Sequence, residues 1–311
     1  MGEDYPKTIL ELERRFATDE ACREYLFQLR WPDGFVCPRC QAGSAWSASR
    51  GRLVCRECRH QTSVTAGTIF QDTRTPLPVW FRAIWYVTSQ KNGTSASSIQ
   101  RILGLRSYQT AWTWLHKLRR AMVRPGRDKL HGRVEADETF IGGEDHKAGV
   151  WVYQKAVVII AAEEDGRGIG RIRLATVTAP TRSNLHRFAV AVIEPGSVVH
   201  TDGFPAWRGL KTLGYKHKRT VLVKKADDKA ASRLLPRVHR VASLLKRWLL
   251  GTHQGAVEPE HLDYYLDEFA FRFNRRTSRS RGKLFYRLLQ QAVEIPPTTY
   301  REMVGGKVPD E

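Results

Sequence analysis

Residues 132–143 read GRVEADETFIGG, and this stretch decides the fold that we expect. Its apolar and polar positions alternate, which predicts a β-strand over residues 134–141. The carboxylates of Glu135 and Asp137 share one face of that strand, and the apolar side chains of Val134, Ala136 and Phe140 share the other. Burying a carboxylate among apolar neighbours is costly, so each must pair with a cation or hold a metal ion. On this stretch alone, the ion pair is the favoured explanation.

A second acid follows another predicted strand. Residues 196–207 read GSVVHTDGFPAW, so an apolar strand over 197–201 runs directly into Asp202. An acid at the carboxyl end of a strand in an α/β sheet points into the functional crevice. Carboxylates from two neighbouring strands suit magnesium or manganese, and two such ions ~4 Å apart activate water or a 3′-hydroxyl for phosphodiester chemistry. Asp137 and Asp202 together therefore predict the chemistry of nucleases, integrases and transposases.

A helix expected near residues 234–250 carries two further candidates. His239 and Lys246 are seven residues apart, which is two helical turns, so they share a face. The neutral imidazole of His239 is a candidate third metal ligand, and Lys246 is a candidate for holding a DNA phosphate. Spacing alone favours the plainer interpretation of two surface residues.

The second half of the chain alternates apolar and helical patterns. Strands are expected over residues 134–141, 155–162, 171–178, 197–201 and 219–223, and helices over residues 183–193 and 234–250. This order predicts an α/β domain with a mixed sheet over residues 130–295, followed by a tail over residues 296–311.

Four of the five cysteines form two CxxC pairs: Cys37, Cys40, Cys55 and Cys58. Two such pairs predict a closed tetrahedral site for structural zinc, within a zinc ribbon over residues 36–65. Paired CxxC units also indicate a reducing compartment, and Cys22 is expected in a helical core. The ribbon is basic, as nucleic-acid contact requires, through Arg39, Arg52, Arg56, Arg59 and His60.

Helical segments flank the ribbon. Residues 1–35 predict two short helices, the second capped by Thr18 or Asp19. Residues 75–124 predict a core helix and then a helix-turn-helix, with Gly104 at the turn and Ser107 capping the second helix. That helix has a polar face suited to a DNA groove, made of Tyr108, Gln109, Thr113 and Lys117. An ordinary helical hairpin is the alternative.

The charge balance indicates a polyanionic partner. Lys and Arg number 51 against 32 Asp and Glu, which gives a net charge of +19. Such an excess favours nucleic acid, although a merely solvated basic surface is the alternative. No apolar run approaches the ~18 residues of a membrane span, and the N-terminus lacks the apolar core of a signal peptide. We therefore expect a cytoplasmic protein that associates with nucleic acid and has no membrane partner.

Several motifs together resemble those of bacterial insertion-sequence 1595 transposases, the ISXO2-like DDE transposases related to the Merlin type of eukaryotes. They are the cysteine ribbon, EADETFIGG, HTDGFPAW, VHRVASLLKRWLLGTHQG and YLDEFAFRFNRR, and they span roughly residues 20–290. The resemblance implies an RNase H-like catalytic domain behind the zinc ribbon and the helix-turn-helix. It also implies binding of double-stranded DNA, both transposon ends and target, and action as at least a dimer.

The resemblance assigns the catalytic positions to Asp137, Asp202, His239 and Lys246, the first three as ligands of magnesium or manganese. Many relatives have Glu or Asn at the third position, so the histidine is a departure from the family pattern and favours manganese. Acids downstream, from Glu258 to Glu268, are candidates for a missing carboxylate. The alternative function is a catalytically degraded, transposase-derived zinc-ribbon protein that only binds DNA. Residues 271–287 also predict an aromatic-anchored helix with a basic face along the DNA.

Overall fold

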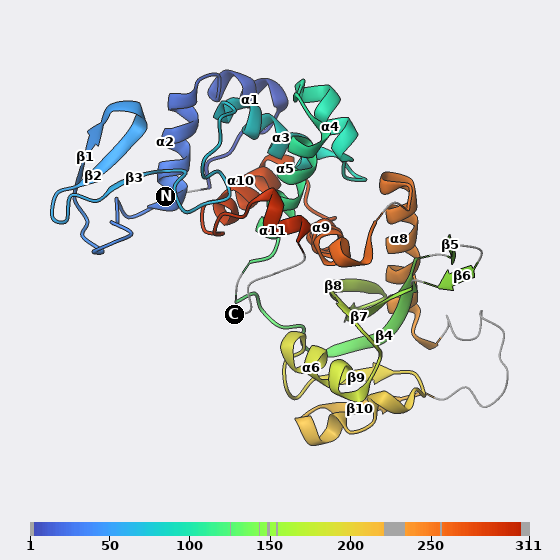
Figure 1. The fold of residues 1–311 in the computed structure, drawn as a ribbon. Coiled ribbons are helices and arrows are strands. Elements are labelled where there is room, and N and C mark those ends of the chain that lie inside the picture. The colour runs from blue at the N-terminus through green and yellow to red at the C-terminus, as the bar shows by residue number, and fades with distance from the viewer. Residues whose placement is uncertain are drawn as a thin grey trace. The chain divides into compact units, whose positions relative to one another are not determined.

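The computed structural model describes residues 3–124, 126–142, 144–147, 150–153, 155–220, 234–255 and 257–305. The chain divides into two compact units, shown in Figure 1. The helical unit comprises Met1–Arg124 together with Ser278–Glu311, and the α/β unit comprises Pro125–Thr277. Within the described residues, no helix is both long and apolar enough to cross a membrane.

The α/β unit is built on a five-stranded sheet with the order β10-β9-β4-β7-β8. The strands are β4 (Arg133–Ile141), β7 (Ala156–Asp165), β8 (Gly168–Val177), β9 (Val198–Thr201) and β10 (Lys216–Arg219). The first three form an antiparallel meander, β9 runs parallel to β4, and β10 runs parallel to β9. This mixed sheet is RNase H-like, as expected. A separate hairpin, β5 (Glu144–Lys147) with β6 (Val150–Tyr153), was not predicted.

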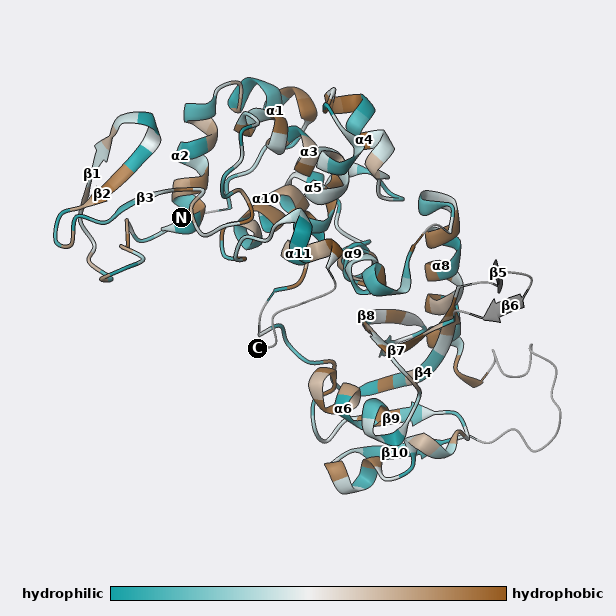
Figure 2. Ribbon diagram, in the orientation of Figure 1, coloured by the Kyte–Doolittle hydropathy of each residue, from teal (hydrophilic) through white to brown (hydrophobic). Residues whose placement is uncertain are grey.

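Helices cover both faces of this sheet, because successive residues of each strand point to opposite sides. On one face Val158 and Ile160 of β7 pack with α8 (Pro236–His253) and α9 (Leu262–Asn274). On the other face Ile159 of β7 packs with α6 (Arg182–Val192) and with Trp207. Brown apolar and teal polar residues both recur along the length of α8 in Figure 2, as expected for a helix with one buried side.

Strand β10 begins three residues earlier than the expected 219–223 segment, of which residues 221–223 lie outside the described residues. The charged sequence KHKR of β10 has no apolar alternation to reveal a strand. Its position is set by pairing, because Lys216 lies opposite Val198 of β9. An edge strand tolerates such exposed charges.

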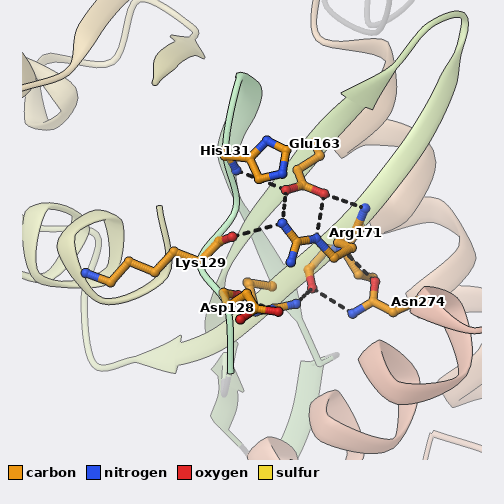
Figure 3. Close-up of polar contacts among 8 residues, drawn as sticks. Asp128, Lys129, His131, Glu163, Arg171 and Asn274 are labelled. Carbon is orange, nitrogen blue, oxygen red and sulfur yellow. Dashed lines mark hydrogen bonds and ion pairs between the residues drawn. The ribbon is translucent and has the colours of Figure 1, made fainter. Parts of the chain in front are cut away.

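The segment that leads into β4 is tied to the neighbouring strands β7 and β8 (Figure 3). Glu163 of β7 accepts a bond from the backbone N–H of His131 at 3.0 Å and one from Nε of Arg171 at 2.9 Å. Arg171 also donates to the carbonyl of Lys129 at 2.9 Å. Asn274 of α9 bonds both the N–H and the carbonyl of Ile172 in β8, at 2.7 and 3.1 Å. These bonds hold β4 in place and attach α9 to the sheet edge.

The helical unit contains the three-stranded ribbon β1 (Ala45–Ala48), β2 (Arg52–Cys55) and β3 (Gln61–Ser63). Its helices are α1 (Ile9–Arg15), α2 (Asp19–Arg30), α3 (Leu77–Ser89), α4 (Ala96–Leu103), α5 (Tyr108–Ala121), α10 (Arg281–Ala292) and α11 (Tyr300–Val304). Thr18, Ser95 and Ser107 accept the capping N–H bonds of α2, α4 and α5. Helices α4 and α5 are joined at left-handed Gly104, as expected both for a helix-turn-helix and for an ordinary helical hairpin. Short 3-10 turns are Ser49–Gly51, Pro205–Trp207, Leu210–Leu213 and Pro259–His261.

The prediction of a single basic helix over residues 271–287 is wrong, because two helices share this stretch. Helix α9 ends at Asn274, and α10 starts at Arg281 because Ser280 caps it. Helix α10 belongs to the helical unit, where Phe285 packs 5.7 Å from the rings of both Phe81 and Trp85. The α/β unit therefore ends at Thr277, before the expected boundary at residue 295.

Most of the basic side chains in this stretch contact the protein itself. The guanidinium of Arg275 lies 4.1 Å from the ring centroid of Phe271, and that of Arg276 lies 4.1 Å from Phe273. Arg287 and Lys283 of α10 form ion pairs with Glu3. These contacts account for much of the aromatic and basic alternation without any DNA.

Candidate active site

The pairing of β4 with β9 brings Asp137 and Asp202 to the same level of the sheet. Glu135 lies directly opposite His200 in the parallel register. Two residues further along each strand are Asp137 and Asp202, the latter immediately after the end of β9. Neighbouring strands lie about 4.8 Å apart, and residues at one level point to the same face. The two acids predicted from separate motifs are thus neighbours, on the face covered by α8.

The carboxylate of Asp137 is largely buried, with 17% of its side chain exposed. Burial, reinforced by the charges of Glu138 and Asp202, raises the pKa of Asp137 to about 7. The Nε2 atom of His239 lies 3.8 Å from Oδ2 of Asp137. The neighbouring carboxylates repel one another, and an imidazole nitrogen lies beside them. A divalent cation bound by these groups would relieve the repulsion.

Asp202 is oriented by its own turn. Its Oδ1 atom accepts the backbone N–H of Phe204 at 2.9 Å, an Asx-type turn that fixes the carboxylate where the chain leaves the sheet. The following residues lead to Trp207, whose indole N–H donates to Glu138 at 3.1 Å. Burial raises the pKa of Glu138 as well. Glu138 was not expected at this site, because strand alternation places it on the face opposite Asp137.

Glu135 has a different role from Asp137, although the two share a face of β4. Its carboxylate is 1% exposed and accepts the backbone N–H groups of Arg237 and Val238 at 2.7 and 3.0 Å. Its other oxygen accepts Nη1 of Arg237 at 2.9 Å. The N-cap residue Leu235 makes no side-chain cap, so Glu135 satisfies the exposed amides at the start of α8 instead. The ion-pair explanation therefore holds for Glu135, and it leaves Asp137 free for another role.

The contacts between Glu135 and the start of α8 at Arg237, here called the Glu135–Arg237 clamp, set the position of His239. Arg237 also donates to the carbonyls of Gly166 and Gly168 at 2.8 and 2.9 Å, so the start of α8 is tied to β4 and to the β7–β8 turn. His239 lies in the first turn of α8, and its N–H bonds the carbonyl of Leu235. Nothing in the sequence pattern of Glu135 or Arg237 signals this contact, because it joins residues 102 positions apart.

Glu135→Ala is expected to destabilise the α/β unit by about 3–5 kcal/mol, because the first two amides of α8 and Nη1 of Arg237 lose their buried acceptor. The measurement is hydrogen exchange of the β4 and α8 amides in the full chain. The matched control is Glu164→Ala, since Glu164 lies 3.5 Å from the same Arg237 but in a more exposed pair. That control should cost under about 1 kcal/mol. Equal losses in the two variants would show that the clamp is not the main anchor of α8.

Lys246 lies two turns after His239 on α8 and is exposed. Two of the acids considered as substitutes for a missing carboxylate have other partners. Asp263 accepts bonds from the N–H and hydroxyl of Thr176, at 2.9 and 2.6 Å, and the buried Glu268 pairs with Arg272 at 2.7 Å. His239, 3.8 Å from Asp137, is therefore the candidate for a third ligand that the structure supports best.

The four ribbon cysteines form a second candidate metal site, in the helical unit. Among the described residues they are the only group of three or more candidate ligand atoms that all lie within 4.8 Å of one another, so Asp137, Asp202 and His239 are arranged more loosely. Sγ of Cys37 lies 3.6 Å from that of Cys58, and Cys40 lies at the same distance from Cys55. Four converging thiolates fit a tetrahedral zinc ion.

The two cysteine knuckles have matching backbones. Gln41 and Arg59, each immediately after the second cysteine of its pair, have left-handed φ angles of 64° and 57°. Burial raises the pKa of Cys37, but the amides of Cys40 and Arg39 outweigh this effect and lower it to about 6. Cys22, by contrast, is buried in α2 and has a pKa raised by burial to about 12. It belongs to the core, as expected.

Comparisons with known proteins match both parts of the chain. The ISXO2-like transposase domain matches residues 129–274, and the transposase zinc-ribbon domain matches residues 17–61. An uncharacterized protein in transposable element ISH50 of Halobacterium salinarum is 26% identical over 290 residues, covering 87% of this chain and 95% of that protein. The zinc-ribbon match starts just before α2 and ends at residue 61, so it includes α2 as well as most of the expected 36–65 segment.

Two solved structures have limited similarity. The catalytic core domain of BIV integrase is 17% identical, with a TM-score of 0.29, and covers 44% of this chain and 80% of its own. The Mos1 transposase in a paired-end complex with the left transposon end is 10% identical, with a TM-score of 0.23, and covers 63% of this chain and 76% of its own. Both candidate sites lie within the matched domains. The zinc-ribbon match includes the four cysteines, and the transposase-domain match includes Asp137, Asp202 and His239.

Proposed function

Because the chain belongs to the insertion-sequence 1595 family of transposases, we propose that it binds the inverted-repeat ends of a mobile element and cuts and joins DNA there. The reaction would be metal-dependent hydrolysis of a phosphodiester, followed by transfer of the freed 3′-hydroxyl to target DNA. The observation that carries this proposal is the parallel register of β4 and β9, which brings Asp137 level with Asp202 beside His239.

In this proposal Asp137 and Asp202 hold the catalytic cations, and His239 completes the ligand set with its neutral imidazole. Magnesium or manganese, when bound, would activate the attacking oxygen and stabilise the leaving one. The Glu135–Arg237 clamp keeps His239 in reach of Asp137, and the Asx turn keeps Asp202 aimed at the same space. Lys246, exposed on α8, would hold a phosphate of the bound DNA.

DNA recognition would fall to the helical unit. Tyr108 and Gln109 are exposed at the N-terminal end of α5, where a recognition helix contacts base edges. Thr113 and Lys117 of the same face are half-buried, so the contact region is shorter than the sequence pattern implied. Zinc at the four cysteines would hold the ribbon in shape, and pairing of two ends would require at least a dimer.

The purified full-length protein should nick duplex DNA that carries the element's own terminal inverted repeats when manganese is added. It should then join the cut end to a second duplex, and gel analysis separates the two products. Nicking without joining would mean a nuclease. End binding without either product would mean the non-catalytic DNA-binding protein, in which His239 no longer supports chemistry.

A further inference from the structure

A cavity of about 530 Å³ lies inside the helical unit, well away in sequence from the acids of the α/β unit. Three segments line it: the start of α2, the tip of the β1–β2 hairpin with β3, and the loop before α3. Its volume falls in the range of roughly 300–1,000 Å³ that is typical of ligand sites.

Four arginines from these segments line the cavity: Arg23, Arg50, Arg52 and Arg74. The one acid among the lining residues, Asp19, has both oxygens occupied. Its Oδ1 atom accepts the N–H of Leu77 at 2.7 Å, and its Oδ2 atom pairs with Arg23 at 2.9 Å. The cavity therefore has a net positive charge, and an anion would compensate it.

The hairpin tip is shaped to hold its arginines at the cavity. Arg50 has a left-handed φ of 61°, an uncommon conformation for a residue with a side chain. Gly51 follows at φ 67°, and a Cβ atom there would meet Cδ of Arg23 at 3.1 Å. The tip thus lies directly against α2. Arg52 is oriented by Gln61, to which its Nη1 atom donates at 3.1 Å.

Two of the arginines are available to a ligand. Arg50 and Arg74 are exposed, and neither has a hydrogen-bond or ion-pair partner among the residues that the structure describes. They approach the cavity from different segments, so their guanidinium groups can contact one anion, or two adjacent ones, from two sides. Guanidinium groups match phosphate oxygens in geometry as well as in charge.

We infer that this cavity binds the phosphodiester backbone of duplex DNA, as an anchor separate from the helix-turn-helix. The inference rests on the proposed function, because it takes DNA as the polyanion that the chain binds. Contacts of this kind position a protein on the duplex without reading its sequence. The anchor would place the zinc ribbon and α2 against the backbone while α5 reads the bases.

The test is the salt dependence of DNA binding by the full-length, zinc-loaded chain, measured by fluorescence anisotropy. Magnesium and manganese are left out so that the DNA is not cut. Arg50→Gln/Arg74→Gln should weaken binding on the order of tenfold near 0.1 M salt. It should also reduce the slope of log K against log salt by ~1.8, because each phosphate contact contributes ~0.9. The loss should be the same on end DNA and on unrelated DNA.

The matched control is Arg14→Gln/Arg301→Gln, which removes two exposed arginines from α1 and α11 of the same unit. Its slope should change by much less than that of the cavity variant. The cavity anchor would be overturned if wild type and the cavity variant had equal salt slopes, or if the two double variants lost equal DNA affinity. Neither result would overturn the transposase proposal. A wild-type chain that binds no duplex DNA would overturn both. Zinc content and melting temperature, measured on each variant, identify any loss that comes from unfolding.

Discussion

Asp137→Asn is expected to reduce end cleavage by about 10³-fold or more, which corresponds to about 4 kcal/mol of transition-state stabilisation. Asparagine has nearly the same shape as aspartate, so the fold is retained, but the site loses the anion that would bridge the metal ions. Asp202→Asn should have an effect of the same order, because the two residues lie at one level of neighbouring strands. Affinity for end DNA, measured without divalent cations, should remain within about twofold, since the acids repel phosphates rather than bind them.

The control for this prediction is Asp165→Asn, the same change at an exposed residue at the end of β7. It should cleave at the wild-type rate. The assignment of the catalytic acids fails if Asp137→Asn and Asp165→Asn cut DNA equally well.

Loss of the zinc ion is expected to unfold the ribbon. Binding of structural zinc contributes on the order of 10 kcal/mol in small cysteine sites, and a three-stranded ribbon of this size has little core to replace it. Cys37→Ser should therefore bind no zinc and should lose protease resistance across residues 36–65. The α/β unit should keep its hydrogen-exchange protection, because the cysteines belong to the other unit.

Cys22→Ser serves as the comparison for the zinc prediction. Cys22 is a buried thiol in α2 and is not part of the cysteine cluster, so this variant should lose some stability but retain its zinc. Metal analysis and limited proteolysis of the two variants provide the readout. A Cys37→Ser protein with full zinc content and an intact ribbon would contradict a four-cysteine site.

Features with local causes could be predicted from the sequence. The CxxC spacing predicted the cysteine cluster, the capping residue Ser107 predicted the start of α5, and alternation predicted β4. In each of these cases, the signal and the structure that it predicts lie within a short stretch of the chain. The neighbouring positions of Asp137 and Asp202 join two such stretches, one acid within a predicted strand and the other directly after a second strand.

Features that depend on long-range contacts could not be predicted. Glu135 and Asp137 have the same sequence context, and only the position of Arg237 separates a structural carboxylate from a candidate ligand. Strand β10 lacks apolar alternation and depends on pairing with β9. Helix α10 packs against aromatic residues of α3, roughly 200 positions earlier in the chain, which moved the unit boundary. The roles of His239 and Lys246 stay predictions.

The most direct test of the central claim is the location of manganese in crystals of the full chain bound to end DNA, read from anomalous scattering. We expect manganese between the carboxylates of Asp137 and Asp202, with Nε2 of His239 as a ligand, and no such signal in Asp137→Asn crystals grown in the same way. Manganese bound elsewhere in the wild-type complex, with that space empty beside the bound DNA, would contradict the account.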